Sequence, residues 1–211
     1  MISFFFSSLA DSALLLPASC LFLASLAALR QWRLAGVLTV GLVCVAVLTI
    51  GAKLAFRACG ASIDSDVVSP SGHTSFAIVF YGAGIMMFGA GRPAWIQRGL
   101  GVGFALFILA VGISRVRTEA HSPTEVLIGA VLGALALGVS LALYRRTDRP
   151  TLPWFPVAAV FLVAVMAFGG RHFSLEHRIA SAARRLSGAL DVCGPQERSG
   201  TSWLDTTSQN P

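Results

Sequence analysis

The chain has 211 residues, of which 55% are hydrophobic and only 12% are charged. A soluble globular domain carries roughly 25% charged residues, so this composition excludes an ordinary soluble protein and indicates an integral membrane protein. The net charge of +6 does not indicate a nucleic-acid partner, because the arginines are dispersed between apolar runs and form no continuous basic face. Anionic membrane lipids are the better match.

Six apolar runs follow one another along the chain, and each is close to the ~20 residues that a membrane span requires. A cleavable signal peptide has positive charge before its apolar run, and no positive charge precedes the first run here. This run is therefore expected to stay in the membrane. The fourth run reaches full length only if Arg98 and Arg115 lie near the two interfaces. The sequence therefore predicts an all-α fold, a polytopic membrane helical bundle with about six transmembrane helices. The runs cover residues 13–29, 34–52, 74–91, 99–113, 126–144 and 152–170.

Two longer polar segments, residues 53–73 and 114–123, interrupt this pattern. Counting the membrane crossings between them places both segments on the same face. The three short connections on the opposite face carry seven arginines, which the positive-inside rule assigns to the cytoplasm. The polar segments are then expected to face outward, although basic residues occur on their side as well.

The chain divides into one membrane domain and a tail. Residues 1–173 form the predicted six-span domain. Residues 174–190 repeat apolar positions at helical spacing with arginines between them, which is typical of an interfacial amphipathic helix. Residues 191–211 are rich in Ser, Thr, Gly, Pro and Gln, a composition that predicts disorder.

The first polar segment ends in Pro70-Ser71-Gly72-His73-Thr74-Ser75, directly before an apolar run. This position predicts a helix N-terminus, whose N–H groups bind anions. Gly72 would let a phosphate approach the backbone, and the Ser71 hydroxyl could join the cradle. His73 could protonate a leaving oxygen. The alternative is structural: Ser71 is a simple helix cap and His73 an interfacial residue.

The second polar segment contributes Arg115, His121 and Glu125. Arginine offers a bidentate fork for phosphate oxygens. A neutral imidazole at His121 could attack phosphorus, and Glu125, one helical turn later, could fix its tautomer. The sequence Ser122-Pro123-Thr124-Glu125 is also a capping box with proline at the first helical position. Glu125 could therefore be a cap, a catalytic carboxylate, or both.

Together, the Pro-Ser-Gly-His segment and the Ser-Arg with a histidine six residues after the arginine resemble two signatures of the type 2 phosphatidic acid phosphatase and vanadium haloperoxidase superfamily. The resemblance implies a helical bundle in which His121 forms a phosphohistidine and His73 is the general acid. Arg115, Ser71 and the Gly72 amide would hold the phosphate without a metal or other cofactor. Members of this superfamily act on lipid phosphates, commonly at the outer face of the bacterial inner membrane.

Two positions depart from this family's pattern. The last motif position is usually aspartate, where this chain has Glu125, a longer carboxylate that could still reach His121. The first signature is a lysine followed seven residues later by Arg-Pro, whereas Lys53 is followed at that distance by Gly60-Ala61. Arg57, one helical turn after Lys53, could supply the missing cation. Alternatively, Lys53 and Arg57 only mark the membrane interface.

These features predict a membrane phosphatase that acts on a lipid phosphate or diphosphate. The haloperoxidase activity of the same superfamily fits less well, because six apolar spans favour a lipid substrate. A different class of function is a catalytically impaired protein that binds a lipid headgroup, or a small transporter. A transporter would more often show polar or broken helices near the membrane midplane, whereas the ionisable residues here cluster at the ends of apolar runs.

Overall fold

Six helices make up nearly all of the described part of the chain, which comprises residues 2–59, 69–147, 162–163 and 166 of a computed structural model. No strand occurs in these residues, so the predicted all-α fold is confirmed. In chain order the helices are α1 (Ile2–Leu9), α2 (Ser12–Ala28), α3 (Trp32–Cys59), α4 (Gly72–Gly89), α5 (Ala94–Arg117) and α6 (Pro123–Tyr144).

Helices α2 to α6 correspond to the first five predicted spans, with their ends shifted by a few residues. The sixth predicted span, residues 152–170, lies almost wholly outside the described residues, as do the predicted amphipathic helix and tail. Helix α1 was not predicted, because eight residues are too few for a span. Helix α5 has 24 residues and includes Arg98 and Arg115 near its two ends, so the short fourth run is indeed extended past both arginines.

Three of the helices, α3, α5 and α6, are long and apolar enough to cross a membrane, while α2 is a shorter apolar helix. The outer surfaces of these three helices expose large hydrophobic side chains along most of their length. Such a surface is suited to lipid tails and not to water, and it indicates membrane association. The exposed residues include Val43, Val47, Val102, Leu106, Leu109, Leu127, Val131 and Leu135.

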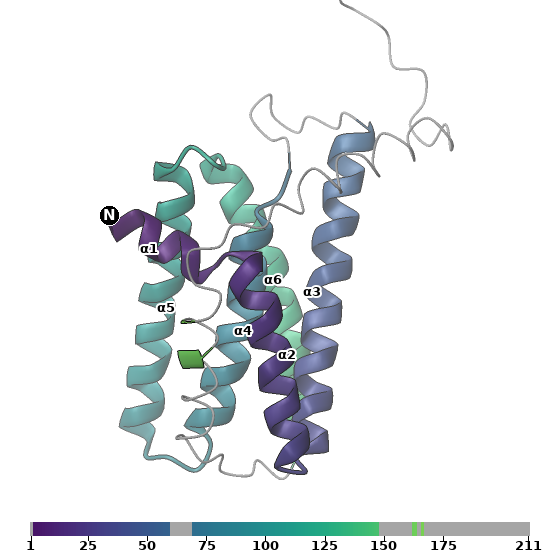
Figure 1. Cartoon of the computed structure of the whole chain (residues 1–211), viewed down its shortest axis with the longest axis vertical. Coiled ribbons are helices and arrows are strands. Elements are labelled where there is room, and N and C mark those ends of the chain that lie inside the picture. Colours follow the sequence, from purple (N-terminus) through teal and green to yellow (C-terminus); the bar gives the residue numbers. More distant parts are fainter. Residues whose placement is uncertain (1, 60–68, 148–161, 164–165, 167–211) are drawn as a thin grey trace, which may run out of the picture.

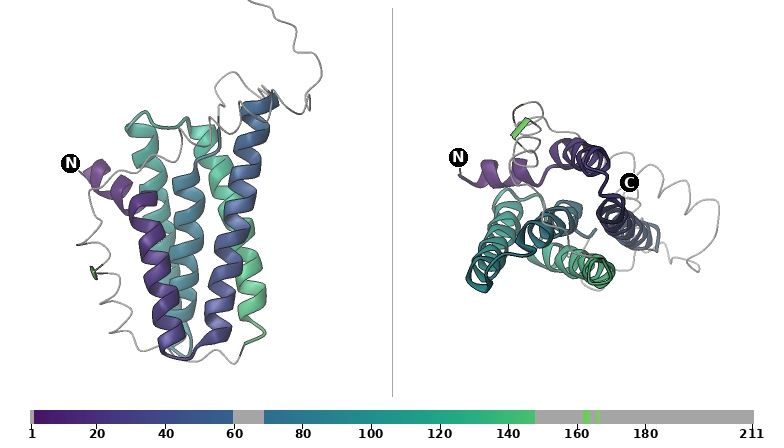
Figure 2. Two further views of the ribbon diagram at one scale, coloured as in Figure 1. Left: turned by 45° about the vertical axis from the view of Figure 1, so that its right-hand side comes forward. Right: turned by 90° about the horizontal axis from the view of Figure 1, so that it is seen from below.

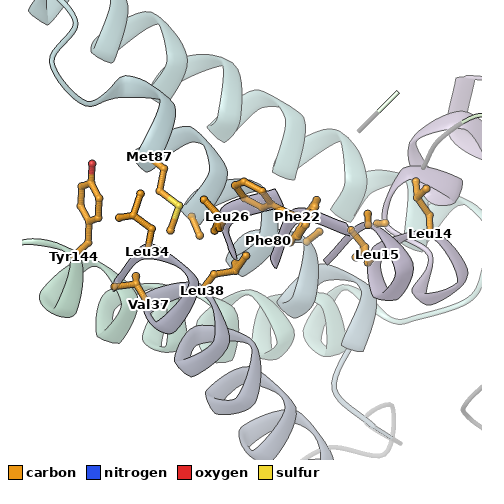
Figure 3. Packing of buried hydrophobic residues seen from close by; sticks show 14 of the residues in the cluster. Leu14, Leu15, Phe22, Leu26, Leu34, Val37, Leu38, Phe80, Met87 and Tyr144 are labelled. Carbon is orange, nitrogen blue, oxygen red and sulfur yellow. The ribbon is translucent and has the colours of Figure 1, made fainter. Parts of the chain in front are cut away.

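Helix α4 lies in the middle of the bundle and contacts α2, α3, α5 and α6 (Figure 2). Its apolar side chains meet those of α2 and α3 in the main buried cluster (Figure 3). Phe80 packs edge-on against Phe22 of α2, with ring centroids 6.2 Å apart. Met87 of α4 and Leu38 of α3 are completely buried in the same cluster. A central helix enclosed in this way gives the residues at its N-terminus a fixed position.

Helices α4 and α6 approach each other closely through small residues. A Cβ atom on Gly133 would lie 2.8 Å from the carbonyl oxygen of Ser75, and one on Gly129 would clash with the carbonyl oxygen of Ser71. Small residues permit such approaches between membrane helices. The two glycines therefore set α6 directly against the first turns of α4.

Helix α1 runs across the bundle instead of along it, near the end where α5 finishes (Figure 1). It packs on α5, where the rings of Phe6 and Phe107 are 6.1 Å apart. The hydroxyl of Tyr81 in α4 donates a hydrogen bond of 2.8 Å to the carbonyl of Leu9. The chain then turns at Asp11, whose side chain caps α2 by accepting a hydrogen bond from the N–H of Ala13. This α1–α2 corner, residues 7–11, lies over one end of the bundle.

Candidate active site

The predicted site residues meet at one end of the bundle, where α3 and α5 finish and α4 and α6 begin (Figure 1). The described ends of both polar segments therefore lie at the same end of the bundle, as the count of crossings predicts. Seven of the eight predicted residues are fully described and lie here. They are Lys53 on α3, Ser71, Gly72 and His73 at the start of α4, Arg115 on α5, His121 in the α5–α6 loop and Glu125 on α6.

Glu125 connects the two polar segments, and only 6% of its surface is exposed. One carboxylate oxygen, Oε2, lies 2.7 Å from Nδ1 of His121. The other, Oε1, accepts a hydrogen bond of 2.6 Å from the backbone N–H of Ser69, in the segment that leads into α4. The carbonyl of Glu125 also accepts a hydrogen bond of 3.0 Å from the N–H of Ser71. A single residue thus holds the histidine and the start of α4 in a fixed relation.

The same glutamate also completes a capping box at the start of α6. The Ser122 hydroxyl accepts a hydrogen bond from the N–H of Glu125, and Oε2 accepts one from the N–H of Ser122. Both roles proposed from the sequence, cap and partner of His121, are therefore present in one side chain. The departure from aspartate is accommodated as well, because the longer carboxylate spans the distance to the ring.

The turn between α5 and α6 brings His121 back over the end of α5. Glu119 has a positive φ of 54°. The N–H of Glu119 donates to the carbonyl of Val116 and that of Ala120 to the carbonyl of Arg115. This is the hydrogen-bond pattern of a Schellman motif, whose left-handed position is usually glycine. A glutamate in the left-handed conformation costs about 1–2 kcal/mol of folding free energy. The hydrogen bonds of the turn offset this cost and fix the loop before His121.

The surroundings of His121 favour the neutral imidazole. Burial lowers the pKa of His121 below its ordinary value of 6.5, the hydrogen bond and charge of Glu125 oppose this change, and the positive charges of Arg115 and Lys53 lower the pKa further. A carboxylate only accepts hydrogen bonds, so the hydrogen of the neutral ring lies on Nδ1. The lone pair is then on Nε2.

The N-terminus of α4 is available to an anion. Ser71 occupies the N-cap position, but its side chain makes no capping hydrogen bond; instead its hydroxyl lies 3.1 Å from that of Thr74. Ser71 is therefore the N-cap residue by position, as the structural alternative holds, but its hydroxyl does not cap the helix. The first N–H groups of a helix have no partner within it and favour negative charge. An anion at this position would meet the backbone at Gly72.

Lys53 is almost completely buried, with 2% of its surface exposed. A Cβ atom placed on Gly72 would lie 3.7 Å from Cε of Lys53, so this side chain passes directly beside the start of α4. The alternative that Lys53 only marks the membrane interface does not account for this burial. Arg57 lies one turn further along α3, but its side chain is outside the described residues, as are Gly60 and Ala61. Its role as the replacement cation stays a prediction.

Two residues of the α1–α2 corner reach the site, and the sequence reasoning did not find them. Nη1 of Arg115 donates a hydrogen bond of 2.7 Å to the hydroxyl of Ser7. Oδ2 of Asp11 lies 3.8 Å from Nε2 of His73. A signal was present, since an aspartate directly before an apolar run is a typical N-cap. Nothing in the sequence, however, placed this corner beside the two polar segments.

Comparison with known proteins agrees with this geometry. The family model described as PAP2 superfamily matches residues 52–149, which contain both polar segments. The chain is 30% identical over 179 residues to an uncharacterized 22.5 kDa protein in the cps region of Klebsiella pneumoniae, covering 79% of this chain and 80% of that protein. No solved structure matches the chain. From the matched segment and the relative together, the chain belongs to the PAP2 superfamily.

Proposed function

We propose that this protein is a membrane phosphatase that hydrolyses a phosphate ester of a lipid through a phosphohistidine at His121. Membership of the PAP2 superfamily supports a phosphatase-type activity. The observation that carries the finer proposal is the contact of 2.7 Å between Nδ1 of His121 and Oε2 of Glu125. That contact occupies Nδ1 and leaves Nε2 as the attacking atom in a ring whose pKa is lowered by burial.

In the first step, Nε2 of His121 attacks phosphorus while the bond between phosphorus and the lipid oxygen breaks. Protonated His73 gives its proton to that oxygen, and the lipid alcohol leaves. The imidazolium that forms at His121 is stabilised by the carboxylate of Glu125. In the second step, water attacks phosphorus, the phosphorus–nitrogen bond breaks, and neutral His73 accepts the proton of the water. Phosphate leaves and both histidines return to their starting states.

Fixed positive charge supports both steps. Lys53, Arg115 and the N–H groups at the start of α4 would hold the phosphoryl oxygens and neutralise the charge that develops on them. Arg57 would add a further cation if its side chain turns toward the same end. The position of Lys53 supports this role, because its Cε would lie 3.7 Å from a Cβ atom placed on Gly72 at the start of α4.

The position of the site supports a lipid substrate. The catalytic groups lie at the end of a bundle whose sides expose apolar residues, so a phosphorylated headgroup can reach them while its chains stay in the bilayer. The opposite end carries Arg30, Arg33, Arg92 and Arg98, and the positive-inside rule would make that end cytoplasmic. The active site would then lie on the outer face of the membrane, which in a bacterium is the periplasmic face of the inner membrane.

The test is phosphate release from phosphatidic acid, phosphatidylglycerol phosphate, undecaprenyl diphosphate and lipid A, in detergent and without added metal. We expect release by wild type and none by His121→Ala, and acid-labile phosphate bound to the wild-type protein after rapid quenching. Arg115→Gln should be severely impaired, whereas the exposed Arg117 on the same helix end provides the matched control, Arg117→Gln, with nearly normal activity. A folded wild type that releases phosphate from none of these lipids would favour the headgroup-binding alternative.

A further inference from the structure

The α1–α2 corner places a buried carboxylate against the proposed general acid. Asp11 is 6% exposed, and its Oδ2 lies 3.8 Å from Nε2 of His73. Asp11 precedes the segment matched by the family model, residues 52–149. The contact joins two parts of the chain that are more than sixty residues apart.

The two carboxylate oxygens of Asp11 have different partners. Oδ1 accepts the N–H of Ala13 at 2.8 Å, which caps α2, while Oδ2 is the oxygen nearer to His73. A helix cap alone is satisfied equally well by asparagine or serine. A buried negative charge is costly unless a positive charge lies close to it. A carboxylate at this position, unlike asparagine or serine, can form an ion pair with His73 when the ring carries its proton.

The position of Asp11 is fixed by neighbours on both sides. Tyr81 of α4 holds the carbonyl of Leu9, Arg115 of α5 holds the hydroxyl of Ser7, and Ala10 is completely buried. The corner is thus tied to the same two helices that carry His73 and Arg115. A carboxylate held this firmly can orient a ring.

We propose that Asp11 is a positioning residue for His73: its carboxylate holds the imidazole in place for proton transfer to the leaving lipid oxygen. This inference rests on the proposed phosphatase function. It extends the site beyond the matched segment to the N-terminal corner. Asp11 itself contacts neither phosphate nor lipid in this role.

The competing explanation is that Asp11 is only a cap, and two variants separate the explanations. Asp11→Asn keeps the cap, because asparagine is an equally good N-cap residue, but removes the charge. Asp11→Glu keeps the charge, although glutamate is not a preferred N-cap residue. A positioning role predicts that Asp11→Glu is the more active variant on a lipid phosphate, and a capping role predicts the reverse order.

The substrate supplies a second readout that a structural role would not change. The alkoxide of a lipid phosphate must be protonated as it leaves, whereas the phenolate of p-nitrophenyl phosphate leaves as a stable anion. We expect Asp11→Asn to lower kcat on phosphatidic acid by at least about tenfold and on p-nitrophenyl phosphate by less than about twofold, since general acid catalysis contributes 10²–10⁴ where it is needed.

The experiment measures both substrates with wild type, both Asp11 variants and His73→Gln, each checked for a monodisperse profile in detergent. His73→Gln should show the same substrate selectivity as Asp11→Asn in a stronger form. Equal losses on both substrates, or a more active Asp11→Asn than Asp11→Glu on the lipid, would overturn the inference while leaving the phosphatase function intact. A folded wild type inactive on p-nitrophenyl phosphate and on all four lipids named above would refute the function and the inference together.

Discussion

Replacing Glu125 by glutamine separates catalysis from folding, because the carboxylate has donors on both sides. Oε1 faces the N–H of Ser69, and Oε2 faces Nδ1 of His121 and the N–H of Ser122. A glutamine has one oxygen and one NH₂ group. If its oxygen faces Ser69, its NH₂ meets His121 and forces the hydrogen onto Nε2, where the lone pair is needed. If the amide is flipped, its NH₂ meets the N–H of Ser69 in a buried environment.

The two costs differ in size. A buried donor without an acceptor costs about 1–3 kcal/mol of stability, which leaves most of the protein folded. Where a carboxylate fixes the tautomer of a catalytic histidine, the amide variant loses activity by about 10⁴-fold, equivalent to about 5 kcal/mol in the barrier. We therefore expect Glu125→Gln to be folded but nearly inactive.

The assay is phosphate release per folded molecule, with the folded fraction taken from thermal unfolding in detergent. Ser122→Ala is the matched control, because it removes the other half of the capping box without touching the imidazole. It should cost about 1 kcal/mol of stability and keep its activity. If the two variants lose activity in proportion to their folded fractions, the cap alone explains Glu125 and the catalytic reasoning is refuted.

Three further predictions follow from the geometry. Because burial lowers the pKa of His121 below 6.5, the nucleophile stays neutral as the pH falls to 6.5, so the acid limb of the kcat/KM profile should lie below that pH; a limb at or above it would contradict the assignment. Gly129→Ala would push a methyl group into the carbonyl of Ser71 and should lower both Tm and activity at a cost of about 1–3 kcal/mol, whereas Gly138→Ala, which meets only open space, should not destabilise the protein. Vanadate, an analogue of the pentacoordinate phosphoryl state, should inhibit the wild type competitively. Direct binding measurements should show that Arg115→Gln no longer binds vanadate.

The parts of the site that could be predicted from the sequence are those set by local pattern. The turn of α4 that holds Gly72 and His73 follows from its place before an apolar run. The spacing of His121 and Glu125 is one helical turn, and the structure brings the two side chains together. Membrane parity then places both segments at one end of the bundle. Each of these steps requires only helix periodicity and the alternation of faces.

The remaining contacts depend on how helices pack, which periodicity does not specify. The link from Glu125 to Ser69 joins α6 to the segment that leads into α4, and it exists because Gly129 and Gly133 allow α6 to approach α4. Helix α1 was missed because it is shorter than a span, and with it Asp11 was overlooked. A short apolar segment can be placed only when the surface that receives it, here α5 with Phe107, is known.

The small residues of α6 have a consequence for how the protein responds to its bilayer. In lipid, helices are held together by close contact and not by the hydrophobic effect. The contacts extend from Gly129 beside Ser71 to Ser140, whose hydroxyl meets Gly41 of α3, over about 16 Å of helix. A slide of one residue, about 1.5 Å, would break the contact between Glu125 and Ser69. A thinner or thicker bilayer should therefore tilt α3, α4 and α6 as one unit, and the distances between catalytic groups should be preserved under hydrophobic mismatch.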